Sequence, residues 1–281
     1  MKRTEEFMKK KTFWAICALL VVLSIPALSW VSIKKSQLLH FDTPNVATTI
    51  KNIAVNSTTS NTELFEQYIK SVYDQTNLEA TGLSPEVFKK ALIGYYNFKK
   101  TQLVSPEKAI LTIIDFSRKS SQKRLWIVDL LNNRLLFNTI VAHGQGSGLD
   151  IATNFSNSSN SHQSSLGFYI TSDTYFGKHG LSMRLEGMDK GFNTNARDRA
   201  IVIHGAEYVS QSFVDHTGRL GRSHGCPALP VELTKTIIEV IKGQTCLFIN
   251  GPAKDYTSNY LDESLAVENF AASSNIIQAS I

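Results

Sequence analysis

Cysteine is scarce in this sequence. The 281 residues include three cysteines, Cys17, Cys226 and Cys246, and no two of them have the close paired spacing of a structural zinc site. Cys246 lies in a short apolar run typical of a strand, so we expect it to be buried. A Cys226–Cys246 disulfide is one alternative, but it would not require the histidines and glycines beside Cys226. We therefore expect Cys226 to be a reactive thiol.

A large excess of one charge is also missing once the first 29 residues are set aside. The chain has 29 Lys/Arg against 24 Asp/Glu; residues 1–29 hold five and two of these, which leaves 24 against 22. No basic stripe and no internal repeat is visible. The composition therefore argues against nucleic-acid binding and fits one large core or two small ones.

The start of the chain combines basic and apolar residues. Five Lys/Arg within residues 1–11 precede an apolar run over residues 13–28, which is the pattern of an export signal. Small residues at Ala27 and Ser29 suit cleavage, whereas residues 12–31 are about long enough, at roughly 20 residues, to span a bilayer. We expect residues 1–30 to be a signal peptide or a membrane anchor, in contact with the membrane at least during export. The rest would face the periplasm or cell envelope.

Two helices are predicted after a polar stretch. Residues 31–61 are rich in Ser, Thr and Asn over most of their length, which is typical of a flexible linker. In residues 62–105, Phe65, Ile69 and Tyr73 recur at helical spacing, and a second apolar helix begins at a Ser-Pro-Glu sequence. These helices are predicted to form a small helical cap.

The chain becomes β-rich over residues 106–252, and its fold class is predicted to be mainly β with α. We expect a mostly antiparallel sheet, folded into a sandwich or partial barrel, with one helix at residues 231–242. Residues 253–281 have weak periodicity and are expected to be a loose tail. The predicted strands cover residues 109–116, 124–130, 134–142, 167–171, 182–185, 200–204 and 245–250.

A long polar segment interrupts the β-rich part at residues 143–165. It is rich in Gly, Ser and Asn and contains His143 and His162. One interpretation is a mobile surface loop, and the other is a loop that lines a substrate site.

Residues 221–228 read Gly-Arg-Ser-His-Gly-Cys-Pro-Ala, and the strand-like run 201–205 ends in His204. Acyl transfer by a thiol needs a nucleophile, a proton acceptor and N–H donors for the developing oxyanion. Cys226 offers the nucleophile, and His204 or His224 could accept its proton. Gly225 lets the backbone approach a substrate closely.

These residues resemble the signature of the L,D-transpeptidase (YkuD-like) catalytic-domain family. His204-Gly205 followed by Ser223-His224-Gly225-Cys226 carries the resemblance. The sequence of residues 221–230 is similar to that of the narrower murein L,D-transpeptidase catalytic-domain branch. Residues 141–144, 164–170, 191–193 and 199–202 also resemble family segments, so the likeness covers about residues 80–250.

The resemblance implies roles for individual residues. Cys226 would be the nucleophile, and His204 the base, oriented through the carbonyl of Gly205. The N–H groups of Gly225 and Cys226 would form the oxyanion hole. The segment Arg222-Ser223-His224 would line the substrate site, and neither a metal nor another cofactor is implied.

The chain departs from the family after the cysteine. The commoner members carry an aliphatic residue and then an arginine there, where this chain has Pro227 and Ala228. Arg222, Arg197 and Arg199 are candidates to replace that arginine.

The family implies a peptidoglycan substrate and a carbapenem-sensitive enzyme. Cys226 would attack the stem peptide after its third residue, and an amine from a neighbouring stem would complete a 3–3 cross-link; water would give L,D-carboxypeptidase activity instead. Two other classes remain open, namely a zinc site formed by His204, His216, His224 and Cys226, and a cell-wall-binding protein without turnover.

Overall fold

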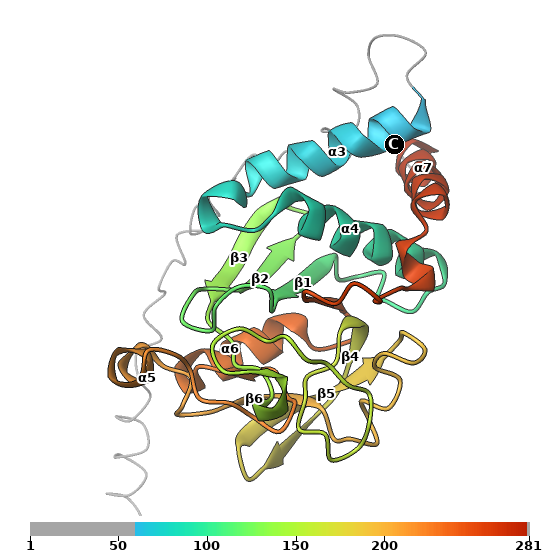
Figure 1. The fold of residues 1–281 in the computed structure, drawn as a ribbon. Coiled ribbons are helices and arrows are strands. Elements are labelled where there is room, and N and C mark those ends of the chain that lie inside the picture. The colour runs from blue at the N-terminus through green and yellow to red at the C-terminus, as the bar shows by residue number, and fades with distance from the viewer. Residues whose placement is uncertain (1–59, 280–281) are drawn as a thin grey trace, which may run out of the picture. The chain divides into compact units, whose positions relative to one another are not determined.

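A single mixed sheet of eight strands is the centre of the computed structural model, which describes the backbone of residues 60–279 and the side chains of residues 60–273. The strand order is β3-β2-β1-β8-β4-β5-β6-β7, and the sheet curls into a half-barrel (Figure 1). Only β1–β8 and β6–β7 pair in parallel. The mainly-β fold with α is confirmed in its partial-barrel form. The strands are β1 (Ile110–Asp115), β2 (Leu125–Asp129), β3 (Arg134–Thr139), β4 (Gly167–Gly177), β5 (Gly180–Gly187), β6 (Val202–Gly205), β7 (Ala228–Leu229) and β8 (Cys246–Asn250).

Helices cover both faces of this sheet. The three helices α3, α4 and α7 pack together on one face, and α6 packs on the other (Figure 1). The predicted single helix of the β-rich part is α6, but a further short helix, α5, precedes it. The helices are α3 (Asn61–Gln75), α4 (Pro85–Lys100), α5 (Gln211–Thr217), α6 (Val231–Ile241) and α7 (Glu263–Ala279).

Side chains that alternate along the strands build two separate cores. In β1, Leu111 and Ile113 join the core beneath α3, α4 and α7, whereas Ile114 joins the core beneath α6. Residues of β8 divide in the same way, with Phe248 on the first side and Leu247 on the second. Because successive side chains point to opposite faces, a strand buried on both faces reads as a continuous apolar run.

Helix α4 lies unusually close to the sheet at Gly94. A Cβ atom on this residue would stand 2.1 Å from the ring of Phe168, so no larger residue fits without a shift. A glycine inside a helix costs about 1 kcal/mol relative to alanine, and here it permits the close contact between α4 and β4.

The C-terminal segment is not the loose tail that its weak periodicity predicted. Helix α7 places Phe270 among Phe65, Tyr68 and Tyr96, with ring centroids 5.0–5.4 Å away. The buried amide of Asn97 also donates to the main-chain oxygens of residues 260 and 262, which lead into α7. The prediction was wrong because α7 depends on burial against α3 and α4, which a local pattern does not reveal.

The two described cysteines lie on different sides of the sheet. Cys246 belongs to the core under the α3–α4–α7 layer, whereas Cys226 packs against the core under α6, and both are free thiols. The Cys226–Cys246 disulfide is therefore excluded. Residues 1–59, which contain the predicted signal or anchor and nearly all of the predicted linker, lie outside the described residues. No helix within residues 60–279 is long and apolar enough to cross a membrane.

Candidate active site

Cys226 lies in a tight turn just before β7. Ser223 holds this turn from inside, because its Oγ accepts the N–H of Gly225 at 3.0 Å and donates to the carbonyl of Cys226 at 2.7 Å. Gly225 has φ +124°, and a Cβ atom there would stand 2.8 Å from the carbonyl oxygen of Gln163. Only glycine fits this backbone conformation and this close approach.

The Cys226 thiol faces the backbone that leads into β6. The N–H of Val202 donates to Sγ at 3.5 Å, and the carbonyl oxygen of Ala200 lies 3.7 Å from Sγ. Ala200 itself has φ +53°, in the left-handed region that non-glycine residues rarely adopt. An unusual backbone turn thus brings a donor and an acceptor to the sulfur.

His204 stands near the end of β6 and is buried, with 4 % of its surface exposed. Its Nδ1 lies 2.9 Å from the carbonyl oxygen of Gly205. Because a carbonyl can only accept, Nδ1 carries the hydrogen and Nε2 keeps its lone pair. The predicted orienting contact of Gly205 therefore has the geometry that a proton-accepting Nε2 requires.

Cys226 and His204 line one cavity of about 590 Å³. No Asp or Glu is among the residues that line it in the described part of the chain, whereas three histidines, Lys178, Arg199 and Arg222 are. The lining residues are Tyr175, Gly177, Lys178, His179, Ser182, Arg199, Ala200, Val202, His204, Tyr208, Arg222, Ser223, His224 and Cys226.

Residues 79–250 match the family model of the L,D-transpeptidase catalytic domain. This chain belongs to the L,D-transpeptidase catalytic-domain family. The matched region contains α4, all eight strands and the cavity, whereas α3 and α7 lie outside it. Among curated proteins, no match was found.

Several solved structures are similar to this chain. An L,D-transpeptidase from Mycobacterium smegmatis is 11 % identical over 51 % of this chain and 59 % of its own, with a TM-score of 0.32. One from Stackebrandtia nassauensis is 16 % identical over 74 % and 90 %, with a TM-score of 0.32. The helical cell shape determining protein Pgp2 from Campylobacter jejuni is 13 % identical over 63 % of each chain, with a TM-score of 0.37. The chain spans less than two thirds of the first and third of these structures.

Burial sets the resting protonation states of this L,D-transpeptidase-family site. It raises the pKa of the Cys226 thiol, although the N–H of Val202 and the charges of Arg199 and Lys178 oppose the shift. It lowers the pKa of His204, and His179 and Lys178 lower it further. At neutral pH the cavity thus holds a thiol and a neutral imidazole. Burial thus outweighs the opposing charges at Cys226.

The two predicted oxyanion donors differ in this structure. The N–H of Gly225 is already bonded to Ser223 Oγ. The N–H of Cys226 donates to no other residue within the described part of the chain. A substrate oxygen would therefore compete only with the residue's own Sγ for the Cys226 N–H and would have to displace Ser223 Oγ from Gly225.

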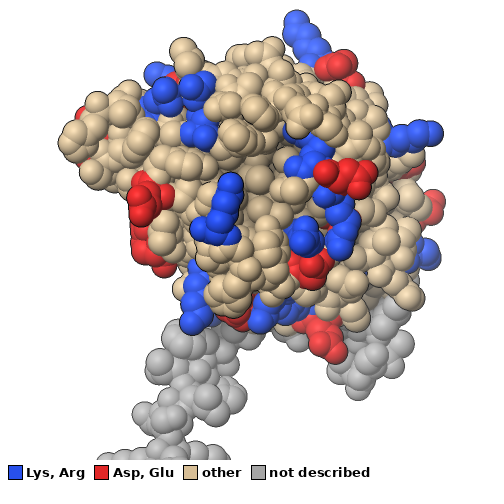
Figure 2. All heavy atoms as spheres, turned by 90° about the horizontal axis from the view of Figure 1, so that it is seen from below, with Lys and Arg blue, Asp and Glu red and all other residues tan. Residues whose placement is uncertain are grey.

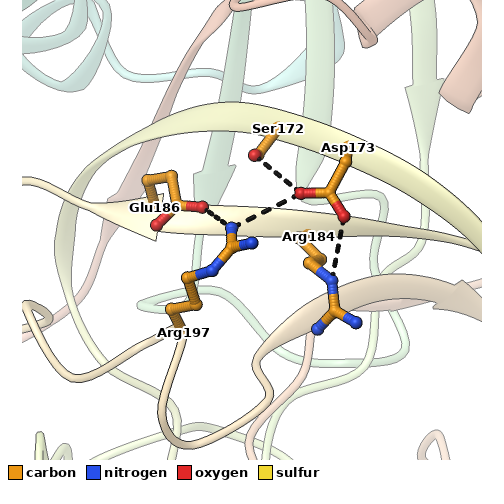
Figure 3. A network of polar contacts seen from close by, with 5 residues as sticks. All are labelled: Ser172, Asp173, Arg184, Glu186 and Arg197. Carbon is orange, nitrogen blue, oxygen red and sulfur yellow. Dashed lines mark hydrogen bonds and ion pairs between the residues drawn. The ribbon is translucent and has the colours of Figure 1, made fainter.

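The three candidate arginines lie in different surroundings. Arg199 lines the cavity, and its guanidinium donates to the carbonyls of Ser156 and Gln163 at 2.5 Å each. Arg222 also lines it and donates to the carbonyl of Gly148 at 2.9 Å. By contrast, Arg197 pairs with Asp173 and Glu186 outside the cavity (Figure 3).

Arg199 is the one of the three arginines whose charge acts on Cys226. Its guanidinium lies 3.3 Å from where a Cβ of Gly225 would stand, and its charge lowers the pKa of Cys226. Through Gln163 it also ties the loop of residues 143–165 to the Cys226 turn. Arg199 thus lies close to the backbone of the Cys226 turn and lowers the pKa of its thiol.

The loop at residues 143–165 packs against the Cys226 turn. Ser164 Oγ donates to the carbonyl of Gly225 at 3.2 Å, and the ring of His162 stacks on that of His224 at 4.2 Å. His224 lines the cavity as predicted, but its ring is occupied by this stack. The loop therefore supports the Cys226 turn from outside, but none of its residues lines the cavity, so the substrate-lining interpretation of its sequence stays a prediction.

The four residues proposed as zinc ligands do not form a site together. His216 lies on α5 with its Nδ1 2.6 Å from the carbonyl of Ser212, and it does not line the cavity. Among the described residues, no group of three or more His, Cys, Asp or Glu is arranged to hold a metal ion.

Sequence reasoning missed the hairpin that forms one wall of the cavity. Strands β4 and β5 extend well beyond the runs predicted for them, and their turn carries Lys178 and His179. The ring of His179 stacks on that of His204, with centroids 4.4 Å apart. A Gly-Lys-His-Gly sequence between two β-rich runs was the only available signal. It predicts a turn, but it does not show that the turn packs against His204.

Proposed function

We propose that this chain is a peptidoglycan L,D-transpeptidase with a cysteine nucleophile. It would cleave a stem peptide after its third residue and transfer the acyl group to an amine of a neighbouring stem, giving a 3–3 cross-link. The observation that supports this best is that Cys226 and His204 line one cavity, with Nδ1 of His204 held by Gly205 so that Nε2 can accept a proton.

Acylation would begin from the neutral pair. His204 Nε2 removes the thiol proton as Sγ attacks the carbonyl carbon after the third residue, and a tetrahedral oxyanion forms. The N–H of Cys226 stabilises this oxyanion, joined by that of Gly225 once Ser223 releases it. The C–N bond then breaks, and Nε2 returns the proton to the departing amine, which leaves a thioester on Cys226.

Deacylation would use the same residues in reverse. The acceptor amine attacks the thioester carbonyl and gives a proton to His204, and collapse of the adduct expels the thiolate, which then recovers that proton. Water in place of the amine would make the enzyme an L,D-carboxypeptidase. The substrate implies that the domain works on the extracytoplasmic side of the membrane.

A direct test uses the purified chain with disaccharide-tetrapeptides from peptidoglycan. We expect intact-mass spectrometry to detect a thioester on Cys226, and chromatography with mass spectrometry to detect cross-linked dimers. Release of the terminal residue without dimers would assign hydrolysis. Binding without any released residue would indicate a wall-binding protein and reject the proposed reaction.

A carbapenem provides a second test of the nucleophile. We expect a single covalent adduct on the peptide that contains Cys226, because opening of the lactam ring by Sγ follows the same course as acylation. An adduct on Cys246, or no adduct, would contradict the assignment. Cys246 is the internal comparison, since it is fully buried on the other side of the sheet.

A further inference from the structure

The β4–β5 hairpin places a lysine without a partner at the mouth of the Cys226 cavity. Lys178 lies in the turn of the hairpin, is exposed, and lines the cavity. Within residues 60–273 its ammonium group has no hydrogen-bond or ion-pair partner. Its three N–H donors are therefore free for a ligand.

The other two cations of the cavity are engaged by neutral acceptors. Arg199 donates to two carbonyls and to the hydroxyls of Ser161 and Ser165, and Arg222 donates to the carbonyls of Gln145 and Gly148. Carbonyls and hydroxyls satisfy the N–H groups without cancelling the charge. Arg199 and Arg222 thus add positive potential to the cavity, and Lys178 adds both potential and free donors.

No acidic side chain in the lining neutralises this potential. Asp173 and Glu186, which lie on the same hairpin, are instead bound to Arg184 and Arg197 (Figure 3). A cavity with three cations, three histidines and no carboxylate of its own is complementary to an anion that enters with the substrate.

We propose that Lys178 and the cations behind it form a carboxylate-binding subsite beside the Cys226 thiol. This inference rests on the proposed function for the identity of the ligand: the terminal carboxylate of the residue that is expelled from the stem peptide. That carboxylate is separated from the attacked carbonyl by one residue, so it would enter the same cavity that Lys178 lines. Lys178 is accordingly a specificity-determining residue for donors with a free C-terminus.

The subsite can be tested without any peptidoglycan substrate. Iodoacetate and iodoacetamide alkylate a thiolate by the same displacement of iodide, and they differ in whether a carboxylate or an amide accompanies the reacting carbon. The measured quantity is the alkylation rate of Cys226 by iodoacetate divided by its rate by iodoacetamide. Dividing this ratio by the same ratio for N-acetylcysteine gives a normalised ratio, which measures how strongly the cavity attracts the carboxylate. Any change in the thiolate fraction of Cys226 affects both reagents equally and cancels.

We expect this normalised ratio to exceed one in the wild type and to fall by about threefold in Lys178→Gln, the size of an exposed ion-pair interaction. Lys178→Arg should retain the ratio, because it keeps the charge. The matched control is Lys190→Gln, which removes an exposed lysine that does not line the cavity. Raising the salt from 0.05 M to 0.5 M should lower the wild-type ratio toward that of Lys178→Gln.

A normalised ratio near one in the wild type would overturn the subsite, and a raised ratio that survives in Lys178→Gln would overturn the role of Lys178. A raised, Lys178-dependent ratio without cleavage of stem peptides would reject the proposed function and keep the subsite. With active enzyme, the tetrapeptide should exceed its C-terminal amide in kcat/KM, and Lys178→Gln should remove most of that preference.

Discussion

Arginines of two kinds surround the β4–β5 hairpin. Arg184 and Arg197 bind the carboxylates of Asp173 and Glu186 at the surface (Figure 3). Arg199 and Arg222 at the Cys226 cavity bind main-chain carbonyls instead. The first pair is neutralised locally, whereas the second keeps its positive charge while it holds loops in place. The bonding partner, rather than the residue type, thus decides where the protein presents a positive potential.

One face of the molecule shows why the sign and number of surface charges alone would not reveal this difference. The face in Figure 2 carries blue and red atoms interspersed among a majority of uncharged ones, without a continuous basic stripe. The small net charge of the part after residue 29 agrees with that view. The positive character of the Cys226 cavity is local, and a net charge does not reveal it.

Among substitutions at the cavity, replacement of Cys226 should have the largest effect on activity. Cys226→Ser should lower turnover by at least about 10³-fold, because a hydroxyl is a far weaker nucleophile without its own activation system. Circular dichroism should show an intact fold, since oxygen is smaller than sulfur. Product formation at the wild-type rate would remove Cys226 from the mechanism.

Loss of the base should have the next largest effect. His204→Ala should slow iodoacetamide labelling of Cys226 at pH 7 by about 100-fold or more, since a general base typically contributes about 10²- to 10⁴-fold. Because burial raises the pKa of Cys226, labelling should recover only above pH 9, where the thiolate forms unaided. The measurement is the labelling rate between pH 5 and pH 10.

His224→Trp is the matched control for this profile. Its ring stacks on His162 rather than on His204, so we expect a much smaller change. A normal profile in His204→Ala together with a shifted one in His224→Trp would reverse the two assignments.

A third kind of arginine, the buried Arg124, predicts a pH dependence of the free energy of unfolding. Arg124 is fully buried, donates to the carbonyl of Val141 and contacts Nδ1 of His143 at 2.8 Å. Burial and this cation lower the pKa of His143 to about 4. The unfolded chain takes up a proton below its usual pKa of about 6.5 and the folded chain does not until about pH 4, so stability should be complete above pH 6.5 and fall as the pH drops to 4.

The expected loss from this group is up to about 3 kcal/mol in the free energy of unfolding. Urea unfolding at pH 7, 5.5 and 4 measures it, and His143→Asn is the control. His204 shifts in the same direction and adds its own contribution in both proteins. An equal pH dependence in wild type and His143→Asn would show that His143 is not the source.

The smallest effect on Cys226 should come from a change among the arginines that are paired with carboxylates, Arg184 and Arg197. Asp173→Asn removes an acid shared by Arg184 and Arg197, both of which stay at an exposed surface. The normalised iodoacetate ratio at Cys226 should change by less than about twofold, because screening by water and salt weakens exposed charges outside the cavity. A change as large as that of Lys178→Gln would show that the two groups of cations act together.

The sequence predicted the elements with strong local patterns. Helix α6 and the buried strands β1 and β8 were found within a residue or two, because amphipathic period and continuous apolar runs are local signals. It failed for α7 and for the full length of the β4–β5 hairpin. Phe270 becomes a core residue only when α3 and α4 are packed beside it, and no window of sequence contains that neighbour.

By itself the sequence determined the residue types of the proposed site, because the motif names Cys226, His204 and Gly225, the glycine that the turn requires at φ +124°. Only the tertiary structure decided the protonation states, the occupied Gly225 N–H and the places of Arg199 and Lys178 in the cavity. Each of these depends on burial or on contacts between segments far apart in the chain, and those quantities exist only once the sheet has brought β5, β6 and the Cys226 turn together.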